Sequence, residues 1–157
     1  MASFVIEGGH RLSGEIYPQG AKNEALQVIC ACLLTESTVT INNVPDIADV
    51  NNLIELMHQI GVEITHKKEK TYTFCAKNIR CEYFETEDYY KKSSSLRGSI
   101  MLLGPLLARL GYAVAPKPGR DKIGRRRLDT HFEGMRKLGA NFTYDEIKQQ
   151  YRIESKK

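Results

Sequence analysis

The sequence predicts an α/β domain made of repeated units, and three observations lead to this prediction. Residues 56–64 and 134–142 read alike, because each contains the end of an amphipathic helix, a glycine and the start of a strand. The two glycines, Gly61 and Gly139, are 78 residues apart (139 − 61), and self-similarity at a fixed spacing indicates a repeat architecture. Finally, 41% of the 157 residues are hydrophobic, which is enough to form a core.

The first unit, residues 21–80, is predicted to run helix, strand, helix, strand, strand. Asp46 is expected to cap the second helix, whose apolar residues recur three and four positions apart. The apolar face of that helix is Ile47, Val50, Leu53, Ile54, Met57 and Ile60. The polar residues 67–70 indicate the turn of a hairpin. The other predicted elements are a helix over 23–34 and strands over 39–41, 63–65 and 71–74.

The second unit, residues 81–157, is predicted to repeat this order. Its first helix is expected to end at Gly111, since glycine is favoured just past the last turn of a helix. A basic loop over 117–127 separates the first strand from the second helix. The predicted elements are helices over 95–110 and 128–138 and strands over 113–115, 141–143 and 151–153.

Residues 1–20 precede the two units and have no counterpart in the repeat. Two segments, 3–6 and 12–17, are strand-like and are expected to pair with a part of the protein outside the two units. The chain ends directly after a strand with no covering helix. We therefore expect the sequence to be part of a longer protein.

The composition favours a cytoplasmic protein without a membrane segment. The longest mostly apolar run, residues 100–107, is far shorter than the roughly 20 residues of a membrane span. The start of the chain lacks the basic and apolar regions of a secretion signal. The four cysteines, Cys30, Cys32, Cys75 and Cys81, do not have the spacing of a metal site, and we expect reduced, mostly buried thiols.

Positive charge is concentrated in one loop, which indicates an anion-binding site. The net charge is only +4, but residues 117–127 contain six basic residues and a single acid, Asp121. Nucleic-acid binding through Arg125, Arg126 and Arg127 is disfavoured, because no aromatic residues are interleaved with them and no recognition motif is present.

Two further cations stand at the starts of predicted helices. Lys22 follows Gly20-Ala21, and Arg97 follows a run of serines at a corresponding place in the second unit. A cation is unfavourable at a helix N-terminus, so an anionic partner would explain each of them. Solvated surface side chains are the alternative for both. Asp129 lies near another helix start, where it either caps the helix or accepts a proton from a substrate hydroxyl.

Four segments, in this order and at this spacing, resemble the landmarks of the UDP-N-acetylglucosamine 1-carboxyvinyltransferases. They are residues 20–23, 96–100, 104–109 and 118–131. Each segment is weak evidence alone, but the combination is specific, and the resemblance covers essentially the whole chain. The shikimate-pathway enolpyruvyl transferases share the fold, whereas the pattern of residues 118–131 favours the UDP-sugar branch.

The resemblance implies a fold of repeated βαβαββ-type units, the inside-out barrel of the enolpyruvyl transferases. Members of the family have two domains, each with three such units around a pseudo-threefold axis and with helices inside. By this resemblance, residues 1–20 are leading strands of the other, mostly absent domain. Residues 21–80 and 81–157 are two of the three units of one domain, with a catalytic loop at 117–127. The missing partner is the C-terminal part of the same enzyme.

The resemblance also implies a reaction. The family transfers the enolpyruvyl group of phosphoenolpyruvate to the 3-hydroxyl of UDP-N-acetylglucosamine and releases phosphate, which is the first committed step of peptidoglycan synthesis. The implied partners are these two small molecules, without a cofactor, metal, nucleic acid or membrane. The isolated chain is expected to be inactive, because the family places further substrate contacts beyond Lys157. A non-catalytic relative is the alternative, and the joint presence of Lys22, Arg97, Asp121 and Arg126 argues against it.

The residue roles follow position by position from the resemblance. Phosphoenolpyruvate is expected to bind Lys22, Asn23 and Arg126. UDP-N-acetylglucosamine is expected to bind Arg97, Arg126, Arg127, Leu128, Asp129 and Thr130. Asp121 is the expected catalytic residue, because it stands where most members have a loop cysteine that donates a proton and reacts with fosfomycin. Arg120 departs from the family pattern, in which this position is usually glycine.

Overall fold

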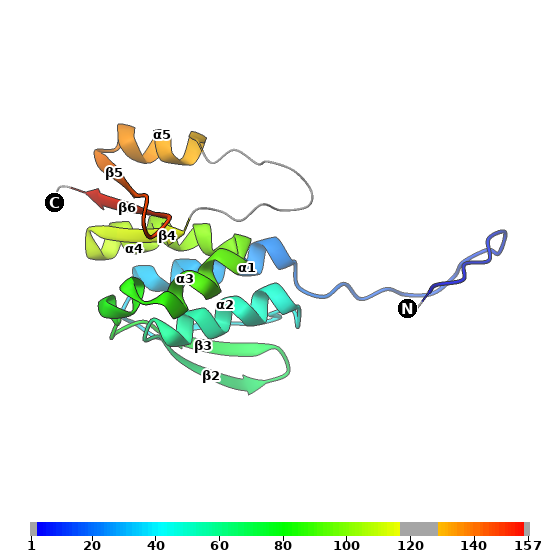
Figure 1. Cartoon of the computed structure of the whole chain (residues 1–157). Coiled ribbons are helices and arrows are strands. Elements are labelled where there is room, and N and C mark those ends of the chain that lie inside the picture. The colour runs from blue at the N-terminus through cyan, green and yellow to red at the C-terminus, as the bar shows by residue number, and fades with distance from the viewer. Residues whose placement is uncertain (1–2, 117–128, 156–157) are drawn as a thin grey trace.

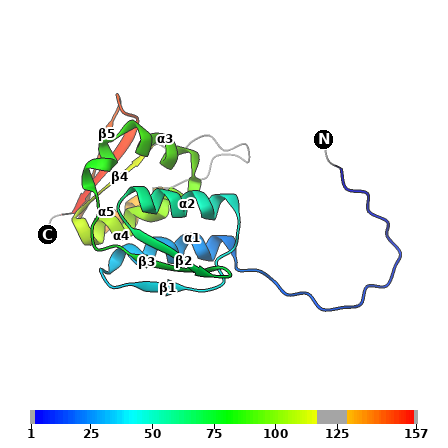
Figure 2. The same ribbon diagram turned by 90° about the horizontal axis from the view of Figure 1, so that it is seen from below.

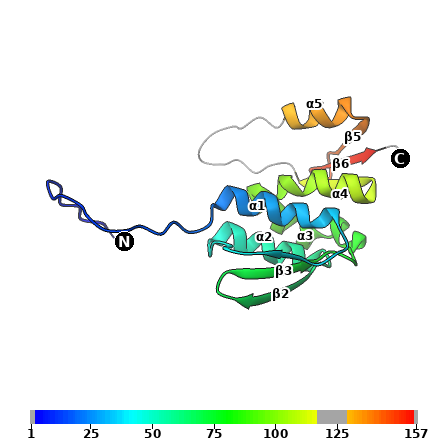
Figure 3. The same cartoon turned by 180° about the vertical axis from the view of Figure 1, so that it is seen from behind.

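A computed structural model describes residues 3–116 and 129–155 of the chain. Helices occupy the middle of the molecule, with one three-stranded sheet below them and a second above them (Figure 1). The view from behind shows the same arrangement, with α5 beyond the second sheet (Figure 3). The fold is therefore α/β, as predicted.

The first unit has the five elements that the sequence predicts. They are α1 (Lys22–Ala31) with a short 3-10 extension (Cys32–Leu34), β1 (Val39–Ile41), α2 (Ala48–Gln59), β2 (Glu63–Lys68) and β3 (Thr71–Cys75). Along α2, Val50, Leu53 and Met57 are buried, as the apolar face predicts. The predicted cap is wrong: Ile47 occupies the N-cap position, and Asp46 instead accepts a hydrogen bond from the Asn51 side chain at 2.7 Å.

The second unit departs from prediction at its first helix. Instead of one helix over 95–110 there are α3 (Glu87–Ser95), a 3-10 segment η3 (Arg97–Leu102) and α4 (Leu103–Leu110), preceded by a 3-10 turn, η2 (Cys81–Glu85). The helices are separate because Leu96 has an extended backbone (φ −107°, ψ 105°). The remaining elements are β4 (Tyr112–Pro116), α5 (Asp129–Lys137), β5 (Ala140–Asp145) and β6 (Gln150–Ser155).

The two sheets share one topology, which confirms the repeat. Their strand orders are β1-β3-β2 and β4-β6-β5, with every neighbouring pair antiparallel and the last strand of each unit in the centre. Gly61 and Gly139 both have positive φ, at 103° and 97°. That conformation strains other residues, which explains why glycine recurs at this position in both units.

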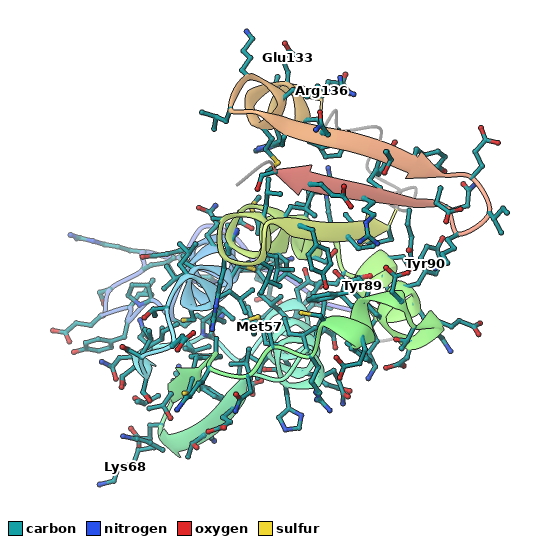
Figure 4. The ribbon with its side chains drawn as sticks, turned by 90° about the vertical axis from the view of Figure 1, so that its left-hand side faces the viewer. Met57, Lys68, Tyr89, Tyr90, Glu133 and Arg136 are labelled. Atoms are coloured by element: carbon teal, nitrogen blue, oxygen red, sulfur yellow. The ribbon has the colours of Figure 1, made fainter. Side chains whose placement is uncertain are left out.

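A continuous core joins the two units. Figure 4 shows Met57 in the interior, where it is fully buried. Arg109 of α4 reaches from the second unit to the first, where its guanidinium donates to the carbonyls of Leu33 (3.0 Å), Thr35 (3.4 Å) and Lys77 (3.4 Å). The Arg109 side chain is only 14% exposed. It therefore satisfies backbone acceptors at the end of the first unit's leading helix and just after β3.

The two strands predicted over 3–6 and 12–17 do not form in the described chain. Residues 3–20 have no regular structure, and the segment before Gly20 extends away from the domain (Figure 2). The large apolar side chains in this segment are exposed, for example Phe4 (97%) and Leu12 (92%). A strand needs a partner for its backbone, and the described residues offer none to this segment. That residues 1–20 belong to another domain stays a prediction.

Candidate functional site

The first predicted site segment lies at the start of α1. Lys22 and Asn23 are the first two residues of this helix, and both are exposed. Gly20 sets where the helix begins, because it packs against the loop that precedes α2. A Cβ built on Gly20 would lie 2.0 Å from the carbonyl oxygen of Asn43, closer than any side chain can approach. Only glycine therefore allows this placement of Lys22.

Lys22 has an anionic partner within the chain. Its Nζ forms an ion pair with the carboxylate of Asp49, in the first turn of α2. The negative charge of Asp49 is favourable at the start of α2, and it offsets the unfavourable positive charge of Lys22 at the start of α1. The two side chains are 43% and 44% exposed, so the pair contributes little to stability. A sequence pattern could not reveal this partner, since any acid in a first helical turn looks like a helix-dipole residue.

Arg97 lies close to the same helix. It is the exposed first residue of η3, and its neighbour Gly98 packs against Leu26 of α1. A Cβ on Gly98 would lie 3.0 Å from Cδ1 of Leu26. Because Leu26 is one helical turn beyond Lys22, the packing brings the start of η3 near the start of α1. The two cations that occupy corresponding places in the repeat are thus brought to one region.

The third segment is described only in part. Asp129 and Thr130 are the first two residues of α5, and both are exposed. Asp129 is therefore inside the helix, where its charge suits the helix dipole. The other predicted residues of this segment, Asp121, Arg126, Arg127 and Leu128, lie outside the described residues.

The described parts of the site share one end of the molecule. The starts of α1, α2 and α5 and the end of β4 all point to the right in Figure 1 and to the left in the reverse view of Figure 3. This end carries two exposed cations, Lys22 and Arg97, and the positive ends of several helices. Such an arrangement favours a ligand with separate negative groups.

Other surface features do not include the predicted residues. A shallow hollow of about 340 Å³ lies between α2 and the first sheet, where Ile54, Tyr72 and a stacked His66 line it. Within residues 3–116 and 129–155, no group of three or more His, Cys, Asp or Glu side chains is arranged to hold a metal ion. No helix among the described residues has the length and apolar character needed to cross a membrane.

The cysteines are free thiols, and two of them are deeply buried. Cys30 and Cys32 lie on α1 and its 3-10 extension. Burial raises the pKa of Cys30 to about 12 and that of Cys32 to about 11. Both are therefore protonated at neutral pH and are poor nucleophiles. Cys75 and Cys81 are half-buried.

Gly20→Ala is expected to destabilise the protein by about 2 kcal/mol or more, because the backbone must move to relieve the contact with Asn43. Gly134→Ala is the matched control. Gly134 is inside α5 with no atom within 4 Å of an added Cβ, so this change should be neutral or stabilising by up to about 1 kcal/mol. Urea denaturation measures both, and equal midpoints for the two variants would contradict the role assigned to Gly20.

Comparisons with known proteins give consistent matches over nearly the whole chain. A family model described as EPSP synthase (3-phosphoshikimate 1-carboxyvinyltransferase) matches residues 6–157. The UDP-N-acetylglucosamine 1-carboxyvinyltransferase of Bacteroides thetaiotaomicron is 63% identical over 153 residues, which are 98% of this chain and 35% of the relative. The protein of the same name from Porphyromonas gingivalis is 54% identical over 153 residues, again 98% of this chain and 35% of the relative. The chain thus spans about a third of the length of these relatives.

A solved structure has the same fold. The enolpyruvyl transferase NikO from Streptomyces tendae superimposes with a TM-score of 0.72 and 22% sequence identity, over 96% of this chain and 32% of that protein. This likeness confirms the predicted fold class. Each unit has three strands among the described residues, one fewer than a complete βαβαββ unit.

Proposed function

Because the chain belongs to the EPSP synthase family, we propose that it is the N-terminal part of an enzyme that transfers the enolpyruvyl group of phosphoenolpyruvate to the 3-hydroxyl of UDP-N-acetylglucosamine. The observation that carries this proposal is the 54–63% identity to carboxyvinyltransferases of that name over 98% of the chain. The position of Lys22 and Arg97 at one end of the fold supports it, since both substrates are anions.

The proposed assembly follows from the repeat. Residues 21–80 and 81–157 would be two units of one domain, and residues 1–20 would pair with a second domain formed by sequence beyond Lys157. The exposed apolar residues of the leading segment support this assignment, because Phe4, Ile6 and Leu12 have no packing partner in the described chain. The enzyme would supply enolpyruvyl-UDP-N-acetylglucosamine for peptidoglycan synthesis.

In this proposal, cations of the site neutralise the substrates while an acid protonates the methylene carbon of phosphoenolpyruvate. Lys22 and Asn23 would hold phosphoenolpyruvate together with Arg126. The Lys22 ammonium, which pairs with Asp49 in the described chain, would share its charge between that carboxylate and the substrate.

The second substrate would lie against the other described segments. Arg97, Asp129 and Thr130 would contact UDP-N-acetylglucosamine, together with Arg126, Arg127 and Leu128. Asp121 would donate the proton to the methylene carbon as the sugar 3-hydroxyl oxygen attacks the neighbouring carbon. A base supplied by the rest of the enzyme would take the hydroxyl proton. Phosphate then leaves from that carbon, and loss of a proton from the new methyl group restores the carbon–carbon double bond of the enolpyruvyl product.

The isolated chain, residues 1–157, is expected to release no phosphate from the two substrates, because it contains only about a third of the related enzymes. The full-length protein should do so at an enzymatic rate. A phosphate-release assay with both substrates compares the two proteins, and omission of UDP-N-acetylglucosamine is the control for background hydrolysis. An inactive full-length protein that also fails to bind UDP-N-acetylglucosamine in a calorimetric titration would contradict the proposed function. Turnover by the isolated chain would show that the site is self-sufficient.

A further inference from the structure

A buried tyrosine connects α3 with the strand that leads to the basic loop. The Tyr89 hydroxyl donates a hydrogen bond to the carbonyl of Val114 at 2.8 Å, and both residues are buried. Val114 is in the middle of β4, which is an edge strand of its sheet. Figure 4 shows Tyr89 between the ribbons of α3 and β4, whereas its neighbour Tyr90 lies further out. This bond fixes β4 against α3 two residues before β4 ends at Pro116.

A buried serine extends the connection to Arg97. The Ser99 hydroxyl of η3 donates to the Ser93 carbonyl at 2.7 Å, across the helix break at Leu96. That carbonyl belongs to the last turn of α3, where backbone acceptors lack helical partners. Ser93 is also joined to Tyr89, because its hydroxyl donates to the Tyr89 carbonyl at 2.5 Å. Hydrogen bonds therefore run from β4 through α3 to the segment that starts with Arg97.

The hydrogen-bonding groups in this connection are buried, so water does not readily replace their partners. Tyr89 and Ser93 are each 1% exposed, and Ser99 is 8% exposed. The Tyr89 ring is fixed independently by edge-on contacts with Phe84 and Tyr83, at centroid distances of 5.2 and 5.8 Å. Because packing already holds the Tyr89 ring, its hydrogen bond contributes more to the orientation of the connected elements than to the stability of the protein.

We propose that Tyr89 and Ser99 are positioning residues that fix the start of η3, with Arg97, relative to the end of β4. The inference rests on the proposed function, in which Arg97 contacts the sugar nucleotide and the residues after β4 supply the proton donor. Neither Tyr89 nor Ser99 needs to touch a substrate. Their effect is on the relative placement of two groups that must act on one bound molecule, and a shift of about 1 Å between such groups can slow a reaction as much as a hundredfold.

The test uses Tyr89→Phe and Ser99→Ala in the full-length protein. Each variant should lower kcat by about tenfold and change the KM for UDP-N-acetylglucosamine by less than about twofold, because substrate contacts remain while their alignment is lost. The double variant should lose less than the product of the single losses, because both bonds belong to one connection. Thermal unfolding is recorded for every variant so that kcat is compared on folded protein.

The matched controls remove the same chemical groups from half-buried residues whose hydrogen bonds are exposed. Tyr83→Phe removes a hydroxyl bonded to the exposed Asp88, and Ser94→Ala removes one bonded within its own helix turn to Lys91. Both should retain the parent kcat. If Tyr89→Phe and Ser99→Ala also retain it, or if their losses multiply, the positioning role is wrong. A kcat loss accompanied by an equal rise in KM would show that substrate contacts are lost as well, and would contradict a role in alignment alone.

Hydrogen exchange separates this inference from the proposed function. In Tyr89→Phe, the amides of residues 97–102 and 112–115 should exchange faster than in the parent protein, and in Tyr83→Phe they should not. This readout requires no turnover. Unchanged exchange in Tyr89→Phe would overturn the connection even in an active transferase, whereas faster exchange in a protein without transferase activity would leave the connection standing and refute the proposed function.

Discussion

Fosfomycin is expected to leave the full-length protein active and without a covalent adduct. In the family that the sequence resembles, the drug alkylates a loop cysteine, and the resemblance implies that Asp121 occupies that position in this chain. A carboxylate opens the epoxide far more slowly than a thiolate does. Cys30 and Cys32 cannot substitute, because burial raises the pKa of Cys30 to about 12 and that of Cys32 to about 11. Mass spectrometry after incubation with the drug, together with residual activity, measures the outcome.

Two variants of the same position sharpen this test. Asp121→Cys should be inactivated by the drug and carry one adduct on the new thiol. Asp121→Asn should lose turnover altogether, because an amide has no proton to donate at neutral pH. Activity of the parent protein should fall as the pH rises through the pKa of the Asp121 carboxyl in the substrate complex, since only the protonated form is a donor. An adduct on the parent protein with loss of activity would refute the assignment.

Arg126→Ala is expected to lower kcat/KM by an amount equivalent to about 2–4 kcal/mol, the effect of removing one preorganised charge from a developing transition state. Arg126 is implied to contact both substrates, so its loss should affect binding and catalysis together. Steady-state kinetics with each substrate varied in turn would give the value. An effect of this size is expected if the bound substrates exclude water from the site, because the attraction between charges is stronger there than in water.

Arg125→Ala is the control for that prediction. It removes the same charge from the adjacent position, which matches no contact in the family, so kcat/KM should change by less than about 0.5 kcal/mol. Similar losses in the two variants would mean that the basic loop acts through its summed charge. The salt dependence of kcat/KM would then fall equally in both.

Much of the fold could be predicted because periodicity and glycine positions are local signals. The apolar spacing of residues 47–60 fixed the position of α2, and Gly111 and Gly139 marked helix ends that the structure confirms by their positive φ. Repetition then predicted that the second unit would have the order of the first. The site segment at Lys22 could be found for a similar reason, because a cation at a helix start is unusual.

Features that depend on distant contacts could not be predicted. The break at Leu96 occurs inside a run of residues with no helix-breaking signal before Gly98, and the close contact of Gly98 with Leu26 accompanies it. The helix α3 was missed because its sequence is polar and its one large buried side chain, Tyr89, is held by bonds to another element. Asp49 was missed as a partner of Lys22 because 27 positions (49 − 22) separate them in the sequence.

The contacts of Arg109 have a consequence for how the protein unfolds. Its guanidinium satisfies carbonyls of the first repeat from a helix of the second, in a place only 14% open to water. Melting either repeat alone would break these hydrogen bonds and would expose the hydrophobic core that both repeats share, which is costly. The two repeats are alike enough to suggest independent modules, yet because of this contact and the shared core we expect them to unfold together, as a single cooperative foldon.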